Sequence, residues 1–300
     1  MRARYALPAL AAAAALLLSG CVDNSTPATP GESSGSSSAT AVGKDDAAAA
    51  LVPADIVKRG TLLIGTDAAY PPNEYKDTDG SPIGWGIELS NGIAAKLGLK
   101  PQYQVAKFEN IIPSITGGKV DMGESSFTDN VEREKQVDFV NYYNAGILWA
   151  APAGKTVDPN DACGLKVAVQ TGTVEETDEI PAKNEACTAA GKPLIQIMKY
   201  DAQEDATNAV VLGSADALSA DSPVTGYAIS KTGGKLVAAG KSFDVAPYGM
   251  ATQKGSEMTK AVQAALQSMV DDGSYGKILD TWGVADGGIA KITINAAANG

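Results

Sequence analysis

Short apolar runs of strand length recur along this chain, and each is followed by a polar loop and then by a helical pattern. The clearest runs span residues 61–65, 120–123, 165–169 and 215–220. Buried strands have this length and composition, and strands that alternate with helices build a parallel sheet with crossover helices. After a Pro- and Gly-containing stretch at residues 152–159 the pattern restarts. We therefore predict an α/β fold of two lobes.

Polar residues follow four of these strands at their carboxyl ends. The four loops span residues 66–70, 124–128, 170–174 and 221–223, two from each half of the chain. Ligands bind open α/β sheets outside the carboxyl ends of the strands. If the two halves face each other, we expect all four loops to converge on one cleft.

One stretch, KVDMGESSFTDNVEREKQVDF at residues 119–139, concentrates the binding chemistry. It predicts a short strand, a polar corner at residues 124–128 and a helix whose first turn carries Arg133. Hydroxyls beside free backbone N–H groups suit a carboxylate, and an arginine fork can bond both carboxylate oxygens. Taken alone, the stretch favours a plain strand–loop–helix connection with a solvated arginine, since most arginines are exposed.

Composition excludes several classes of function. The formal net charge of this 300-residue chain is −11, whereas a nucleic-acid binder needs a basic face to neutralise phosphates. The chain contains no histidine. A Ser-His-Asp or Cys-His catalytic unit and a His-ligated metal site are therefore excluded.

The N-terminus has the features of an export signal. Arg2 and Arg4 precede an Ala/Leu-rich run at residues 7–18, which is too short to span a bilayer comfortably, and the tetrad LSGC ends at Cys21. This tetrad looks like a bacterial lipobox, so we predict a signal peptide at residues 1–20 and acylation of Cys21. The alternative is an ordinary signal peptide with an incidental cysteine. A lipid chain would anchor the protein to the extracytoplasmic face of the cell membrane.

Residues 21–50 are rich in Ser, Thr, Ala and Gly and contain few large apolar side chains. Such a segment buries too little surface to offset the entropy of ordering it. We predict a flexible, disordered tether here. No later stretch is apolar for long enough to form a transmembrane helix.

Two cysteines remain after Cys21, namely Cys163 and Cys187. An exported chain meets oxidising conditions, which favours a disulfide between them. Neither has a CxxC partner, so a metal site is the weaker interpretation. Two free buried thiols are the third.

Seven motifs together resemble extracellular solute-binding proteins of family 3, the polar-amino-acid receptors of ABC importers. The motifs are GTDAAYPP (65–72), FENIIPSITGGKVD (108–121), ER-KQVDF (132–139), KVAVQTGT (166–173), ADALSADSPV (215–224), PYGMATQKG (247–255) and DDGSYGKILDTWG (271–283). They cover residues 55–283 in the family's order.

The resemblance implies a type II periplasmic-binding-protein-like clamshell with the ligand cleft between its lobes. Lobe 1 would comprise residues 51–148 and 247–300, lobe 2 residues 151–244, and the hinge residues 147–151 and 245–248. It further implies a monomer without cofactor, metal or nucleic acid, whose partners are an amino-acid ligand, an importer permease and, through the lipid anchor, the membrane.

The family's carboxylate-binding residues fall on two loops of this sequence. Arg133 matches the arginine that holds the α-carboxylate, assisted by Ser126 and Thr128. Thr173 and Val174 match a turn whose N–H groups bind the same carboxylate, as a helix N-terminus can.

The rest of the implied site would hold the other parts of an amino acid. Asp221 matches the aspartate that receives the α-ammonium, or it is only a helix N-cap. Ser125 offers a backbone carbonyl to the same group. Tyr70 and Phe108 match two aromatics that flank the ligand side chain, although Phe108 also suits the core. Asp67 can reach toward that side chain, or it is structural.

Three positions depart from the family pattern. Asn73 stands where an aromatic is usual, Gly86 where an aspartate is common, and Glu124 where an apolar residue precedes the carboxylate corner. If Glu124 and Asp67 both face the cleft, aromatics and carboxylates would suit a cationic ligand side chain. Glutamine or another polar side chain is the alternative.

Two other classes of function compete with a receptor that performs no chemistry. A dehydratase acting on a small carboxylate could use the same fold, with Glu124 as the one unusual candidate for a general acid. A sensory ligand-binding domain is the other, but the chain has a lipobox and no attached signalling segment.

Overall fold

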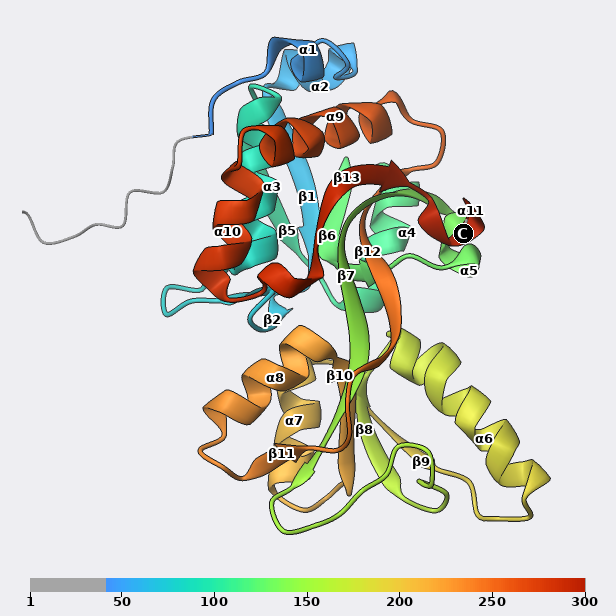
Figure 1. Cartoon of the computed structure of the whole chain (residues 1–300). Helices are drawn as coiled ribbons and strands as arrows, with labels where there is room; N and C mark the ends of the chain where they lie inside the picture. The colour runs from blue at the N-terminus through green and yellow to red at the C-terminus, as the bar shows by residue number, and fades with distance from the viewer. Residues whose placement is uncertain (1–41, 300) are drawn as a thin grey trace, which may run out of the picture. The chain divides into compact units, whose positions relative to one another are not determined.

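One mixed sheet runs through both halves of the chain in this computed structural model, which describes residues 42–299 (Figure 1). Its strands, from one edge to the other, are β5 (Lys100–Val105), β1 (Thr61–Thr66), β6 (Met122–Thr128), β12 (Phe243–Gln253), β7 (Val137–Pro152), β10 (Ala217–Asp221), β8 (Lys166–Gln170) and β9 (Gln196–Tyr200). Two further strands, β11 (Leu236–Ala238) and β13 (Gly288–Ile294), pair with β7.

The first half comprises residues 42–136 and 254–299. Strand β1 pairs in parallel with both β5 and β6, as the predicted crossovers require. The helices of this half are α1 (Asp46–Ala49), α2 (Ala54–Arg59), α3 (Trp85–Lys96), α4 (Ile111–Thr116), α5 (Val131–Glu134), α9 (Glu257–Asp271), α10 (Ser274–Trp282) and α11 (Ala296–Asn299). A small sheet is formed by β2 (Ala69–Tyr70), β3 (Glu74–Lys76) and β4 (Pro82–Ile83), and β3 and β4 form a hairpin.

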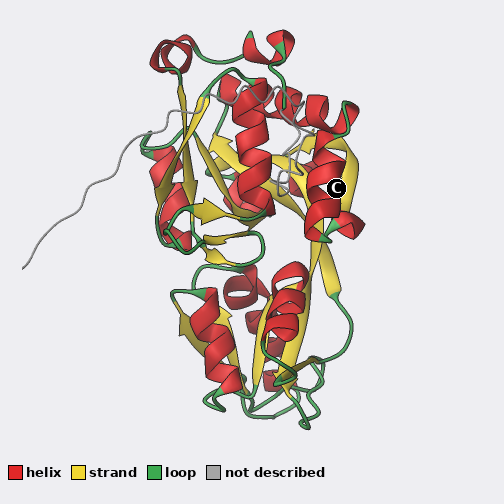
Figure 2. Ribbon diagram, turned by 90° about the vertical axis from the view of Figure 1, so that its left-hand side faces the viewer, coloured by secondary structure: helices red, strands yellow, loops and turns green. Residues whose placement is uncertain are grey.

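The second half comprises residues 153–242. Strand β8 pairs in parallel with β9 and β10. The helices are α6 (Ile180–Ala189), α7 (Gln203–Val211) and α8 (Ser222–Lys231), and a π-helical turn, Glu175–Glu179, leads into α6. Helices flank the strands in both halves (Figure 2). Leu212 lies just beyond α7 and is 80% exposed.

Strands β7 and β12 join the halves as a long antiparallel pair (Figure 1). On β7, Ala145 packs in the core of the first half, whereas Ile147 and Trp149 pack in a core of the second half. The apolar cores therefore separate at the start of the predicted hinge. A two-stranded connection of this kind can bend without disrupting either core.

Residues 42–50 are not a flexible tether, and the prediction is wrong there. Asp45 caps α1 by accepting bonds from the N–H groups of Ala47 and Ala48. Ala48 is 1% exposed and joins the first-half core, with Val42 packed beside it. Small side chains can bury themselves if a larger helix covers them, and here α9 does so. The predicted signal peptide, Cys21 and the rest of the tether lie outside the described residues.

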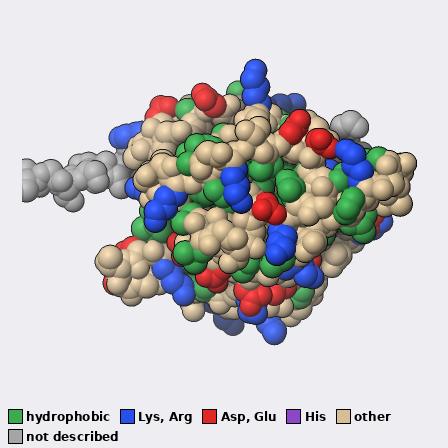
Figure 3. All heavy atoms as spheres, turned by 90° about the horizontal axis from the view of Figure 1, so that it is seen from below, with side chains coloured by type: hydrophobic (Ala, Val, Ile, Leu, Met, Phe, Trp, Pro, Cys, Tyr) green, Lys and Arg blue, Asp and Glu red, His purple; other side chains and the backbone are tan. Residues whose placement is uncertain are grey.

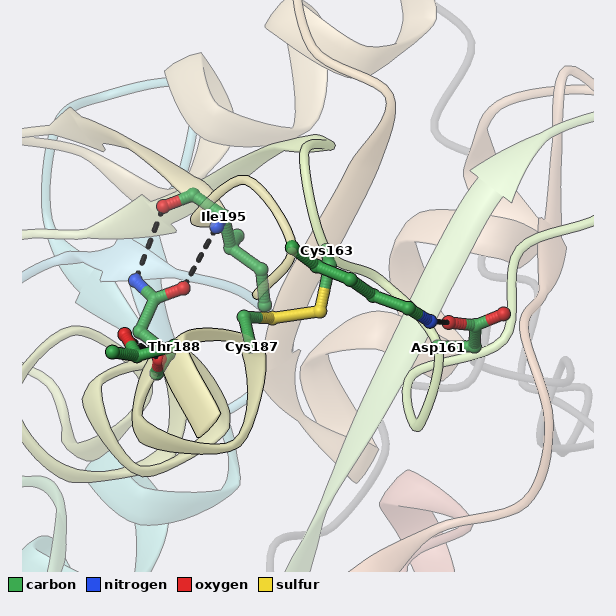
Figure 4. Close-up of a disulfide and its surroundings, with 7 residues drawn as sticks. Asp161, Cys163, Cys187, Thr188 and Ile195 are labelled. Carbon is green, nitrogen blue, oxygen red and sulfur yellow. Dashed lines mark hydrogen bonds and ion pairs between the residues drawn. A yellow bond between two sulfur atoms is a disulfide. The ribbon is translucent and has the colours of Figure 1, made fainter. Parts of the chain in front are cut away.

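The predicted disulfide is confirmed. Cys163 and Cys187 are bonded at 2.01 Å and fasten α6 to the loop before β8 (Figure 4). Beside them, Asn184 exchanges two hydrogen bonds with the backbone of Ile195. On the other side Lys192 pairs with Asp161 at 2.7 Å. The covalent bond thus reinforces a junction that is already hydrogen-bonded.

On the face drawn in Figure 3, basic and acidic side chains are interspersed. Within residues 42–299 no helix is long and apolar enough to cross a membrane. Beyond α10, strand β13 pairs with β7, and the described residues end in α11.

Candidate functional site

All ten residues predicted to bind the ligand line one small cavity. Its water-accessible volume is only about 10 Å³, so the lining side chains nearly fill it. The ten are Asp67, Tyr70, Phe108, Ser125, Ser126, Thr128, Arg133, Thr173, Val174 and Asp221, and they are joined by Gln170 and Glu175. A wider, open groove along α6 includes only Thr128 and Val174 of these residues. The four polar loops therefore converge, as predicted, where the strands end.

The polar corner is part of strand β6 and does not interrupt it, contrary to the prediction. The pairing of β6 with β12 shifts register between Gly249 and Ala251, which leaves a bulge opposite them. Within this bulge Ser126 has a φ of 48°, a left-handed conformation that is uncommon outside glycine. The bulge changes the direction of the backbone and side chains of residues 124–126. The polar sequence of this bulge resembles that of a loop.

The hydroxyl of Ser126 is already engaged on the side of β3. It accepts a hydrogen bond from Asn73 Nδ2 at 2.8 Å and lies 3.1 Å from Glu74 Oε2, to which it donates. The Ser125 hydroxyl likewise accepts from the backbone N–H of Asp67. The side chains of the two serines thus shape the corner by bonds within the first half.

Arg133 lies between the two halves. Asn130 caps α5 and fixes its first turn by accepting from Arg133 N at 2.8 Å. The guanidinium donates to the carbonyl of Thr128 in the first half and to that of Gly172 in the second, at 2.7 and 3.0 Å. It also lies 5.5 Å from the centre of the Phe108 ring, within cation–π range.

Asp221 ends β10 and begins α8, but its side chain makes no capping bond. Instead Asp221 Oδ2 accepts a 2.6 Å hydrogen bond from the Tyr70 hydroxyl, which comes from the first half. Burial raises the pKa of Asp221 to about 6. Of the two roles considered for this aspartate, capping by the side chain is absent.

Asp67 makes a second contact between the halves. Gln170 Nε2 donates to Asp67 Oδ2 at 2.6 Å. Burial raises the pKa of Asp67 to about 6, although the bond from Gln170 opposes the shift. Gln170 also donates to the carbonyl of Asp201, so its amide is held from two sides.

Glu175 is a cavity residue that the sequence analysis missed as a site. It is 1% exposed, and its Oε1 has no hydrogen-bond partner among the described residues. Burial, followed by the charge of Asp221, raises the pKa of Glu175 well above its usual value. Its position two residues after Thr173, in the predicted carboxylate-binding turn, was the sequence signal that could have identified it as a site residue. With Asp67 and Asp221, it gives the cavity three acidic side chains beside one arginine.

Glu124 does not line this cavity, so the hypothesis that it faces the cleft is wrong. It is fully buried beneath α3, where Glu124 Oε1 accepts from the Tyr142 hydroxyl at 3.1 Å. A β-carbon at Gly86 would collide with this carboxylate. Glycine at that position therefore makes room for a glutamate that points away from the ligand.

The sequence profile of the bacterial extracellular solute-binding proteins, family 3, matches residues 62–285. The chain belongs to this family. It is a family of solute-binding proteins, in agreement with the prediction of a receptor and not an enzyme. Within residues 42–299, acidic residues and cysteines form no group that could hold a metal ion.

Curated family members similar to this chain include two arginine-binding proteins. The "Arginine-binding protein ArgT" of Corynebacterium glutamicum is 40% identical over 248 residues, which is 82% of each chain. The "L-arginine-binding protein" of Pseudomonas aeruginosa is 29% identical over 74% of this chain and 87% of its own length.

Solved structures confirm the fold class of this family member. "An ancestral arginine-binding protein bound to arginine" superposes with a TM-score of 0.68 at 33% identity, over 75% of this chain and 98% of that one. The ancestral amino acid-binding protein AncCDT-1, described as a precursor of cyclohexadienyl dehydratase, gives 0.66 at 34% identity, over 76% and 97%. The fold is the type II periplasmic-binding-protein fold.

Proposed function

We propose that this protein captures L-arginine in the cavity between its halves and delivers it to the permease of an ABC importer. The observation that carries the ligand is the acidic lining of the cavity, in which the carboxyl groups of Asp67, Glu175 and Asp221 outnumber the guanidinium of Arg133. A zwitterion needs one basic and one acidic partner, so the surplus carboxylates suit a cationic side chain. The arginine-binding relatives support the same assignment.

The α-carboxylate of the ligand would bind at the first-half corner. Arg133 supplies a planar fork, and Ser126 and Thr128 supply donors of the bulged strand. Thr173 and Val174 add the N–H groups at the start of the helical turn in the second half. The ligand carboxylate would then replace the carbonyl groups of Thr128 and Gly172 as partners of the guanidinium.

The α-ammonium would bind Asp221, assisted by the carbonyl of Ser125. The guanidinium of the ligand would extend toward Asp67 and Glu175, whose buried carboxyl groups gain a cationic partner. Tyr70 and Phe108 would flank the aliphatic part of the ligand. Because the partners of one ligand come from both halves, binding favours the closed arrangement.

We assign lobe 1 to residues 42–148 and 247–299, lobe 2 to residues 151–244, and the hinge to residues 147–151 and 245–248. The separation of the apolar cores at Ile147 supports this division. We further propose that Cys21 carries the lipid anchor, on the strength of the LSGC tetrad. Electrospray mass spectrometry of the membrane fraction would test the acylation, which Cys21→Ala should abolish.

Titration calorimetry of the chain from Val22 onward tests the ligand. We expect arginine to bind and citrulline, its neutral analogue of nearly the same shape, to bind at least about 100-fold more weakly, because buried carboxylates lose a charged partner. Equal binding of the two would refute the acidic subsite. Preference for glutamine would change the ligand but leave the receptor function intact.

The dehydratase alternative depended on Glu124 as its general acid. Glu124 lies outside the cavity, and no other lining residue was proposed for that role. Incubation with arginine and with small carboxylates, followed by chromatography, should return each compound unchanged. Conversion of any of them would overturn the receptor function.

A further inference from the structure

The three positions that depart from the family pattern come together behind the cavity. The backbone N–H of Gly86 donates to the carbonyl of Asn73 at 3.1 Å. A β-carbon at Gly86 would also lie 2.8 Å from the carboxyl carbon of Glu124. Strand β6, helix α3 and the turn before β3 therefore meet in one cluster, and Glu124 occupies the space that glycine leaves.

This cluster contains a second carboxylate, Glu74. Neither Glu74 nor Glu124 has any exposed surface, and Glu74 Oε1 and Glu124 Oε2 have no hydrogen-bond partner among the described residues. Within residues 42–299, no lysine or arginine forms an ion pair with either group. Two charges in such surroundings repel each other strongly, so the pair favours retaining a proton.

One chain of hydrogen bonds connects Glu74, one member of the pair, to the cavity. Ser126 donates to Glu74 Oε2 and accepts from Asn73 Nδ2, and Asn73 Oδ1 in turn accepts from Trp85 Nε1 at 2.8 Å. These bonds hold a residue with a φ of 48°, which L-residues adopt only where the surroundings impose it. The conformation of Ser126 determines where the corner presents its N–H group.

We propose that Glu74 and Glu124 are a proton-sharing pair of positioning residues, which hold Ser126 in place and make the affinity for arginine depend on pH. This inference rests on the proposed function only for the identity of the ligand. The pair touches no ligand atom itself. It acts through Ser126 and through its charge.

The groups around the pair are acidic, phenolic or neutral. Asp67 and Asp221 raise the pKa of Glu74 together with Glu124, after burial itself. The hydroxyl of Tyr142, on β7, donates to Glu124, and Tyr103, on β5, lies within reach of its charge. Burial raises the pKa of Glu124 to about 7, against the opposing effect of the Tyr142 bond. Since the chain has no histidine, no imidazole obscures a titration near this pH.

The sign of the coupling follows from the charges that the ligand brings. Its ammonium and guanidinium would bind Asp221 and Asp67, the two cavity carboxylates whose charge helps to raise the pKa of Glu74, and the net charge of arginine is positive. These cations lower the proton affinity of the pair. Arginine binding near pH 7 therefore releases protons from the pair, and affinity rises with pH through this range. A difference of one pKa unit between free and bound protein corresponds to about a tenfold change in affinity.

Calorimetry at pH 7 in buffers of different ionisation enthalpy measures this release, with the chain from Val22 onward, which contains all the described residues. We expect Glu124→Gln to release fewer protons than the wild type upon addition of arginine, and to show a smaller rise in affinity between pH 6 and 8. The matched control is Glu179→Gln. Glu179 is also a buried carboxylate, bonded to Trp149 and Ser219 outside the cavity, and its replacement should leave the release unchanged.

Ser126→Ala separates the pair from the cavity and tests the positioning step. We expect weaker arginine binding with an affinity that depends less on pH between 6 and 8, while the pH dependence of stability remains. Equal proton release in wild type and Glu124→Gln would overturn the proposal. So would a pH dependence of affinity that Ser126→Ala leaves as steep as in the wild type.

A measurement without ligand keeps the pair testable if arginine does not bind. Urea unfolding between pH 5 and 8 should show stability falling as pH rises, because the folded protein retains a proton that the unfolded chain releases above its ordinary carboxyl pKa. Glu124→Gln and, as a second variant, Glu74→Gln should each flatten this slope. Slopes equal to that of the wild type would refute the proton-sharing pair, whatever the ligand proves to be.

Discussion

The hydroxyl of Tyr70 donates a 2.6 Å hydrogen bond to Asp221 and so joins β2 of the first half to β10 of the second. Gln170 and Asp67 make the reciprocal contact, from the second half to the first. Both acceptors are carboxylates that we assign to the cationic groups of the ligand. Closure and ligand recognition therefore use the same atoms, and changing one should change the other.

Asp221→Asn should weaken arginine binding by about 10- to 100-fold, the range for losing a charged hydrogen-bond partner. Calorimetry at pH 7.5 measures the change. In the wild type, affinity should also fall below about pH 6, where protonation removes the charge of Asp221 and with it the attraction for the ammonium.

The control for Asp221 is Asp205→Asn, an exposed carboxylate in the first turn of α7. It should bind arginine as the wild type does. If Asp221→Asn bound with wild-type affinity, the assignment of the α-ammonium would be refuted.

Arg133→Lys should weaken arginine binding by about 10- to 100-fold even though the charge is kept, because lysine cannot donate two bonds in a plane. Arg59, the other arginine within residues 42–299, pairs with Asp121 away from the cavity. Arg59→Lys provides the matched control and should leave affinity unchanged. The same loss in both variants would point to a general effect of removing arginine.

The elements and the site loops were predictable from sequence because local patterns determine them. Apolar runs marked β1 and β8, and the polar residues that follow these two strands marked two of the loops that line the cavity. The β6 corner was not predictable in detail, since its bulge depends on pairing with Gly249 and Ala251, more than 100 positions away.

The orientations of two side chains could not be predicted from the sequence either. Glu124 belongs to a polar corner whose neighbours line the cavity, yet strand alternation and the space at Gly86 turn it away. Glu175 resembles an ordinary acidic residue at a helix start, and only the approach of the first half makes it a buried cavity residue. In both cases a long-range contact decides the role.

Replacing both Cys163 and Cys187 by serine should lower the free energy of unfolding by about 3 kcal/mol, since the bond closes a loop with a sequence separation of 24. Urea denaturation measures the loss, and the reductant dithiothreitol should reproduce it in the wild type alone. Arginine affinity should remain within about twofold, because the bond lies outside the small cavity.

A protein that starts at Leu51 should be less stable than one that starts at Thr40 by about 1–3 kcal/mol, because it lacks the buried side chain of Ala48 and its cap. Thermal unfolding of the two proteins measures the difference. Asp45→Ala in the longer protein should reproduce part of it. Identical melting temperatures would show that residues 42–50 contribute nothing, as the tether prediction implied.

Gly86→Ala should have opposite effects on stability in two backgrounds. In the wild type the new methyl group meets the carboxylate of Glu124, and overpacking of this kind costs about 1–3 kcal/mol. In a Glu124→Ala background that obstacle is gone, and at this second residue of α3 alanine is favoured over glycine by at most about 0.5–1 kcal/mol, the value for a helix interior.

Urea denaturation of the four proteins in this double-mutant cycle measures the coupling between positions 86 and 124. Gly226→Ala in α8 is the matched control, since a β-carbon there meets no atom within 4 Å. It should stabilise both backgrounds equally. If Gly86→Ala were stabilising in the wild type too, the carboxylate would have room to move, and the close fit between Gly86 and Glu124 would not be what holds the buried pair.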